Sequence, residues 1–125
     1  MRKQYHFRPS ANGYYAWDID RLVSLASACK PQKVKLGDIA EIDEPFWFDR
    51  PDDIPTCRQI AVHARLIEHA DLGYPVIMSP DHRIMDGMHR VLKALNTGLK
   101  TIDAVIFENT PEPDYIDVQP DELLY

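Results

Sequence analysis

Four groups able to do chemistry occur within five consecutive residues, Asp86-Gly87-Met88-His89-Arg90. They are a carboxylate, a glycine, an imidazole and a guanidinium. Apolar runs at 75–79 and 83–85 predict two short strands joined by a turn, and helical spacing over 88–95 predicts a helix that ends at 96–98. Gly87 is expected at a strand-to-helix junction, where the first helical N–H groups lack partners and an anion can approach the backbone. The spacing therefore predicts a phosphate site.

Each side chain of this motif has two interpretations. Asp86 either holds a phosphate-bound Mg²⁺ or acts as a base, or it caps the helix that follows. His89 and Arg90 are either phosphate ligands or exposed residues of the first helical turn. Cations are disfavoured beside the positive end of a helix unless an anion is present, which favours the ligand interpretation. Met88 contributes its backbone N–H group, and Gly87 fits both interpretations.

The stretch from Tyr74 to Phe107, centred on this motif, resembles the ParB/sulfiredoxin superfamily. Its members include the CTP-binding module of chromosome-partitioning ParB proteins, sulfiredoxins, free-serine kinases and ParB-like modules of antibiotic-pathway regulators. In that family a glycine followed by an Arg/His pair opens the helix that holds nucleotide phosphates. The resemblance implies a nucleoside triphosphate or diphosphate, ATP or CTP, bound with Mg²⁺. It also implies that the preceding helix, which carries Arg58 and His63, faces the nucleotide.

Departures from these relatives narrow the expected function. Sulfiredoxins carry their catalytic cysteine where this chain has Met88, and a thioether cannot supply an attacking thiolate. Chromosome-partitioning ParB proteins present Glu-Arg-Arg after the glycine and continue into a DNA-reading region, whereas here His89-Arg90 precedes an acidic tail. The kinases share the Asp-Gly-x-His-Arg pattern, with histidine commonly where Met88 stands. Phosphotransfer also needs a carboxylate to orient the acceptor hydroxyl, for which Glu41, Glu44 and Asp86 are candidates.

Residues outside the motif leave alternatives open. Arg58, expected in the first turn of a helix over 57–71, is either a ligand contact or a solvated side chain. His63 lies near the apolar stripe of that helix, so it is either a core histidine or a ligand. The aromatic cluster at 46–48, which includes Trp47, either packs in the core or stacks on a nucleobase. His82 and Arg83 are expected in a solvated turn.

Composition favours one compact cytosolic domain. The chain has 125 residues, is 45% hydrophobic and carries a net charge of −6. All of that charge lies in residues 108–125, so residues 1–107 are neutral, which argues against sequence-independent DNA binding by this chain. No apolar run approaches the roughly 20 residues that span a membrane. Cys29 and Cys57 are too far apart in sequence for a Cys-x-x-Cys site, and reduced, buried thiols are expected.

The element pattern predicts a single α/β (α+β) domain, residues 1–107, followed by an acidic, proline-containing arm, residues 108–125. Strands are expected near 33–36, 75–79, 83–85 and 100–107, the last three in one small mixed sheet. The aromatic segment 14–17 is expected to form a strand or to pack against one. Helices are expected at 19–28, 57–71 and 87–97, with the last two covering the sheet. The predicted core comprises Trp17, Leu22, Leu36, Ile60, Ala64, Ile67, Val76, Ile77, Ile84, Val91, Leu92, Leu95, Val105 and Phe107.

These observations predict a ParB-like protein that binds a nucleoside phosphate, as a nucleotide hydrolase or a small-molecule kinase if it is an enzyme. Asp86 and His89 are the candidate catalytic residues, and Gly87, Met88, His89, Arg90, Arg58 and His63 the candidate phosphate ligands. The alternative is a non-catalytic module that keeps the fold. It would engage a protein partner, or a second copy of itself, through its aromatic loop or acidic arm.

Overall fold

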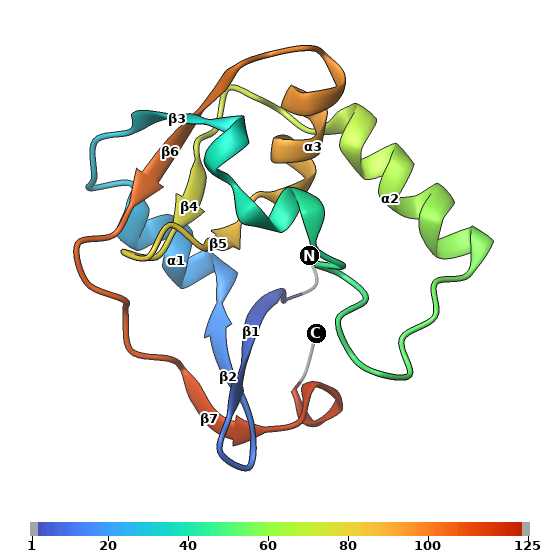
Figure 1. Cartoon of the computed structure of the whole chain (residues 1–125). Helices are drawn as coiled ribbons and strands as arrows, with labels where there is room; N and C mark the ends of the chain where they lie inside the picture. The colour runs from blue at the N-terminus through green and yellow to red at the C-terminus, as the bar shows by residue number, and fades with distance from the viewer. Residues whose placement is uncertain (1–2, 124–125) are drawn as a thin grey trace.

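The computed structural model describes residues 3–123, which form one small α+β fold (Figure 1). Its strands are β1 (Tyr5–Ser10), β2 (Gly13–Asp18), β3 (Gln32–Lys35), β4 (Val76–Met78), β5 (Ile84–Asp86), β6 (Thr101–Ile106) and β7 (Tyr115–Val118). Its helices are α1 (Ile19–Ala26), α2 (Cys57–His69) and α3 (Met88–Asn96), with short 3₁₀ turns at Leu36–Asp38, Ala40–Asp43 and Pro120–Glu122. The predicted α+β class is confirmed.

The larger sheet has the strand order β3-β6-β4-β5. β4 and β6 run parallel, whereas β3 pairs with β6 and β5 with β4 in antiparallel fashion. The expected mixed sheet of the strands near 75–79, 83–85 and 100–107 is therefore confirmed, and β3 completes it. β4 is short and buried throughout, which is typical of a central strand covered on both faces.

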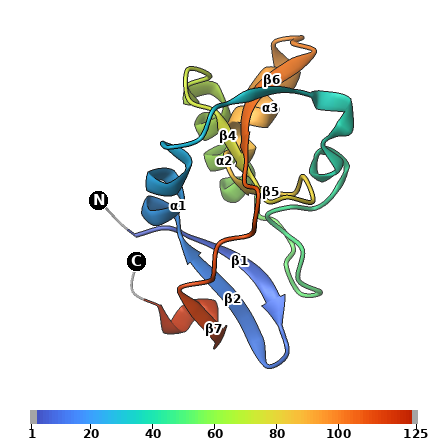
Figure 2. The ribbon, with the colours of Figure 1, turned by 90° about the vertical axis from the view of Figure 1, so that its left-hand side faces the viewer.

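The sheet is covered by α3 on one face and by α1 on the other. Successive side chains of β4 point to opposite faces, so this strand contributes to the core on both sides. Val76 and Met78 pack with α3, whereas Ile77 packs with Leu22 of α1. Figure 2 shows α1 and α3 on opposite sides of the strands. Most of the predicted core residues of the sheet, α1 and α3 are buried.

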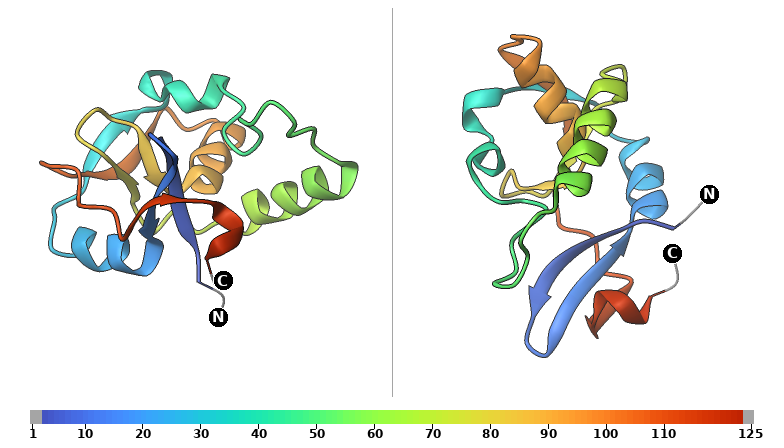
Figure 3. Two further views of the ribbon diagram at one scale, coloured as in Figure 1. Left: turned by 90° about the horizontal axis from the view of Figure 1, so that it is seen from below. Right: turned by 90° about the vertical axis from the view of Figure 1, so that its right-hand side faces the viewer.

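Helix α2 departs from the prediction. It packs against α3 instead of covering the sheet (Figure 3, right). None of its residues is buried. Ile60 is 56% exposed, and Leu95 of α3 is 44% exposed, so both are wrongly predicted as core. Ala64 is also exposed and Ile67 only half-buried. Helical spacing identifies an apolar stripe but not its partner, and here α3 already occupies the sheet face.

A second sheet forms below the first, with the order β1-β2-β7 (Figure 2). No strand is expected before residue 14, but Tyr5–Ser10 is a strand that pairs with β2 in a hairpin. The segment predicted as an extended arm includes β7, which pairs with β2. A side chain at Gly13 would place Cβ 2.8 Å from the backbone oxygen of Val118, so the close approach of β7 requires a glycine there.

Two further expectations concern the surface. Cys29 and Cys57 are free thiols, but both are exposed, so the prediction of buried thiols is wrong. Within residues 3–123, no helix is both long enough and apolar enough to cross a membrane.

Candidate functional site

Gly87 links β5 to α3 in a conformation that suits glycine. Its φ is 107°, and an added Cβ would lie 2.8 Å from Cγ1 of Val76. The first hydrogen bond of the helix runs from the N–H of Val91 to the oxygen of Gly87, at 3.1 Å. The N–H groups of Met88, His89 and Arg90 precede it and have no intrahelical acceptor. The predicted strand–glycine–helix junction is therefore present.

Arg90 and Asp86 are paired across this junction. Nη2 of Arg90 donates to Oδ2 of Asp86 at 2.8 Å, and Nη1 donates to the backbone oxygen of Pro75 at 3.0 Å. The two side chains are only 18% and 22% exposed. Asp86 does not cap the helix, because Gly87 is the N-cap residue and no side chain caps it. Of the interpretations of Asp86, the helix cap is therefore wrong. Arg90 connects the start of α3 to β5 and to the residue before β4.

His89 forms a stacked cluster with His63 of α2 and Trp47. Nδ1 of His63 lies 2.9 Å from Nε2 of His89, so the two imidazoles share a hydrogen bond. The Trp47 ring stacks on both, with centroid separations of 4.0 Å to His63 and 4.4 Å to His89. Trp47 therefore packs on the motif itself.

Burial keeps both imidazoles neutral. It lowers the pKa of His89 to about 4, with a smaller contribution from the neighbouring His63 ring, and it also lowers the pKa of His63. A neutral pair that shares one hydrogen bond always has one outward N–H donor and one outward lone pair, whichever tautomer forms. At neutral pH the pair thus offers a single donor to a ligand.

Arg58 lies apart from this cluster. It is exposed on the first turn of α2, which begins with a capping box: the Thr56 hydroxyl accepts from the N–H of Gln59, and the Gln59 side chain accepts from the N–H of Thr56. Among the described residues Arg58 has no ion-pair partner. The structure therefore brings His63 to the predicted motif but leaves Arg58 in solvent.

Trp47 also lines a cavity of about 720 Å³, which the sequence does not predict and to which His63 and His89 do not contribute. It is bounded by the β1–β2 hairpin, the segment 41–53 and the turn before β5. Its walls combine aromatic rings with three arginines and five carboxylates. These residues come from distant parts of the chain, so no local motif could have predicted the cavity.

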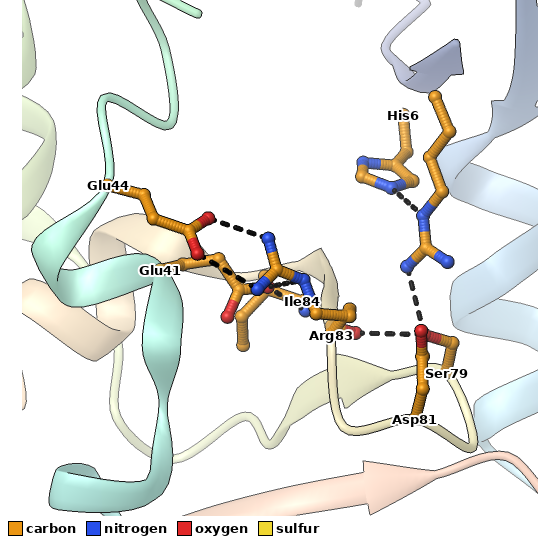
Figure 4. A network of polar contacts seen from close by, with 8 residues as sticks. His6, Glu41, Glu44, Ser79, Asp81, Arg83 and Ile84 are labelled. Carbon is orange, nitrogen blue, oxygen red and sulfur yellow. Dashed lines mark hydrogen bonds and ion pairs between the residues drawn. The ribbon is translucent and has the colours of Figure 1, made fainter.

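A polar network forms part of the cavity wall (Figure 4). Arg83 donates from Nη1 and Nη2 to the two oxygens of Glu44, at 3.0 and 2.6 Å. Buried Glu41 accepts the N–H of Ile84 on Oε2 at 2.6 Å, and Nε of Arg83 lies 3.4 Å from the same oxygen. The turn at 82–83 was predicted to be solvated; His82 is exposed, but Arg83 is anchored by two carboxylates.

The second half of the network centres on Arg8. Its Nη2 donates to the hydroxyl of buried Ser79 at 2.9 Å, and that hydroxyl donates to Asp81. Nε of Arg8 donates to Nε2 of His6 at 3.0 Å, which requires a neutral imidazole. Burial, with a smaller contribution from Arg8, lowers the pKa of His6 to about 3. The guanidinium of Arg8 is therefore held by two partners, His6 and Ser79, and the Ser79 hydroxyl is itself bonded to Asp81.

The described residues contain no group of three or more histidine, cysteine or acidic side chains that could hold a metal ion. Fold and site together define a small α+β protein with a strand–glycine–helix junction beside a histidine pair and a cavity. Comparisons with family models, curated proteins and solved structures find no match for this chain. The resemblance of residues 74–107 to the ParB/sulfiredoxin superfamily remains a prediction from sequence.

Proposed function

We propose that this protein binds a nucleoside phosphate at the start of α3. The observation that carries the proposal is the left-handed Gly87, at φ 107°, immediately before three backbone N–H groups that lack intrahelical acceptors. Such groups, together with the positive end of the helix dipole, favour an anion. The imidazoles of His89 and His63 supply a further donor beside them. Phosphate contacts of this kind do not select a base, so ATP, CTP and GTP remain candidates.

Arg90 supports this site by holding the backbone around Gly87 in place. Its guanidinium is already paired with Asp86 and Pro75, so it fixes the β5–Gly87–α3 geometry that points the N–H groups outward from the helix end. Mg²⁺ fits here only as an ion carried by the phosphates, with Oδ1 of Asp86 as a protein ligand and water completing the shell, because no three-residue metal cluster is present among residues 3–123. If phosphate transfer occurs, we expect Asp86 and His89 to act on it, because they flank the Gly87 junction at the end of β5 and in the first turn of α3.

The proposed ligand makes binding depend on pH. A bound phosphate would favour the protonated form of the imidazole pair, which has two outward N–H donors instead of one. Nucleotide affinity should therefore rise as the pH falls from 7 to 5.5, provided the fold persists. An affinity that is flat or falls over this range would remove the histidine pair from the site.

Calorimetry with ATP, ADP, CTP and GTP, each with and without Mg²⁺, tests the proposal directly. We expect His89→Ala to weaken binding about tenfold, corresponding to the loss of about 1.4 kcal/mol. His69→Ala, which removes an exposed histidine near the C-terminal end of α2, is the matched control and should bind normally. No binding of any nucleotide at millimolar concentration would overturn the proposal.

In that event the interaction-module alternative takes over, and one observation favours it. Helix α2 exposes two apolar side chains one turn apart that a partner could cover: Val62 and Leu66 are 48% and 46% exposed. Exposed apolar clusters of this kind often mark interaction surfaces. Sedimentation of the parent and of a Val62→Ser, Leu66→Ser variant would show whether a second copy is that partner.

A further inference from the structure

The cavity beside Trp47 differs in charge from the proposed phosphate site. Its walls carry three guanidiniums and five carboxylates, and His6 is neutral because burial lowers its pKa to about 3. The formal charge of the walls is therefore −2. A polyphosphate placed there would meet net repulsion, whereas a ligand with positive charge would be attracted.

The buried carboxylate of Glu41 is only half-satisfied. The side chain is 1% exposed and lines the cavity. Oε2 accepts the N–H of Ile84 and faces Nε of Arg83, whereas Oε1 has no hydrogen-bond partner among the described residues. A buried polar oxygen without a donor is costly, and each specific case calls for an explanation.

The three guanidiniums of the cavity wall, by contrast, each have a partner within the protein. Arg83 is engaged by both oxygens of Glu44, and Arg8 is engaged by Ser79 and His6. Arg50 lies over the Tyr14 ring, with its guanidinium carbon 5.3 Å from the centroid. Oε1 of Glu41 is therefore the group in the network that lacks a hydrogen-bond donor. The net negative charge of the walls favours a donor that is a cation.

We propose that this cavity binds a small molecule that carries an ammonium group, and that a small displacement of the buried Glu41 side chain on binding lets Oε1 accept a hydrogen bond from it. A charge-assisted bond of this type is among the stronger hydrogen bonds in proteins. The aromatic rings of Phe46 and Trp47, which also line the cavity, suit the apolar part of such a molecule and can face its cation. A volume of about 720 Å³ is ample for a metabolite-sized ligand. This inference does not rest on nucleotide binding.

The test compares two probes of equal length, n-butylammonium and 1-butanol, by titration of the ¹⁵N-labelled protein. Saturable shifts of the Ile84 amide resonance, whose N–H is bonded to Glu41, are expected with n-butylammonium. 1-Butanol should bind at least tenfold more weakly. Equal binding of the two probes, or no saturable shift with n-butylammonium, would overturn the proposal without any variant being needed.

Variants then locate the charge that matters. Glu41→Gln, which keeps an oxygen for the Ile84 N–H, should weaken n-butylammonium binding at least tenfold, and Asp53→Asn, at the cavity rim, should weaken it severalfold. Glu68→Gln makes the same charge change at an exposed position of α2 and should have no effect. If Glu41→Gln fails to fold, Asp53→Asn and the probe comparison still decide. An unchanged affinity in both cavity variants would contradict the assignment.

A nucleotide titration of the same samples separates this inference from the proposed function. Glu41→Gln should retain the nucleotide affinity of the parent, and His89→Ala should retain the affinity for n-butylammonium. Loss of both ligands in a folded variant would show that the cavity and the start of α3 form one site, which would overturn the separate amine site.

Discussion

The guanidinium of Arg90 reaches back one helical turn to the carboxylate of Asp86, with Nη2 2.8 Å from Oδ2, and also donates to the backbone oxygen of Pro75. One side chain thus connects the start of β4, the end of β5 and the first turn of α3. Because these three points surround Gly87, the pair determines the geometry of the proposed phosphate site. Asp86 and Arg90, which the sequence suggests as ligands, therefore also hold the backbone around Gly87 in place.

Arg90→Ala should destabilise the fold by about 2 kcal/mol, because it leaves a largely buried carboxylate and the Pro75 oxygen without their donor. Asp86→Asn keeps an oxygen acceptor and should cost less, about 1 kcal/mol. Urea denaturation at pH 7 measures both, and a double variant gives the coupling between them. A coupling near zero would show that the ion pair does not brace the junction.

Gly87→Ala should cost about 2–3 kcal/mol, because alanine would have to adopt a positive φ and its Cβ would clash with Val76. Gly98→Ala is the matched control: its φ is 79°, but nothing lies within 4 Å of the added Cβ. It should cost only the backbone term, about 1 kcal/mol. Thermal or urea unfolding of the two variants measures the difference, and equal losses would mean that the contact with Val76 relaxes freely.

Acid should weaken the fold through His6 and His89. Their pKa values are lowered to about 3 and about 4 by burial, so the unfolded chain binds more protons than the folded protein below about pH 6.5. The free energy of unfolding should fall with decreasing pH, by up to about 1.4 kcal/mol per pH unit for each histidine, down to the folded pKa values.

His6→Phe should reduce this pH dependence even if it changes stability at pH 7. Val62→Ser, which changes an exposed side chain of α2 and removes no titratable group, should leave the dependence as it is in the parent. Denaturant titrations at pH 7, 6 and 5 give the slope for each protein. A slope in His6→Phe identical to that of the parent would show that His6 titrates normally in the folded state.

The strand–glycine–helix junction could be predicted from sequence because its signals are local. An apolar run, a glycine and a 3.6-residue period occur in order over residues 75–95, and each depends on its neighbours alone. β1 was not predicted, because Pro9 and the residues after it, Ser10 to Gly13, are typical of a turn. The strand is stabilised by its pairing with β2, which the local sequence does not reveal. The exposure of α2 was not predicted either, because an apolar stripe on a helix does not show which surface the helix packs against.

The partners of the site residues were not predictable for a related reason. Trp47, His63 and His89 come from three segments of the chain that meet only in the folded protein. From sequence, Glu41 is one of three candidate carboxylates for phosphotransfer, yet it is among the most buried side chains. Its Oε2 accepts the N–H of Ile84, which is 43 positions away along the chain. Long-range pairing of this kind leaves no periodic signal.

Removal of residues 112–125 should lower the melting temperature, because these residues include β7 and several of its ties to the rest of the fold. Arg21 of α1 donates to the oxygen of Glu112 at 2.7 Å and pairs with Asp114 at 3.2 Å, and Asp117 accepts from Ser10. Loss of β7 would also expose the edge of β2. Differential scanning calorimetry gives the change in melting temperature.

The same truncation should leave nucleotide binding at the start of α3 intact, because β7 pairs with β2 in the other sheet and its acidic residues would repel phosphate. Asp117→Asn in the full chain is the milder control: it weakens the bonds to Ser10 and the N–H of Asn12 without removing the strand. Circular dichroism and calorimetry with ATP are measured on both proteins. A truncated protein that stays folded but loses ATP binding would show that residues 112–125 belong to the nucleotide site.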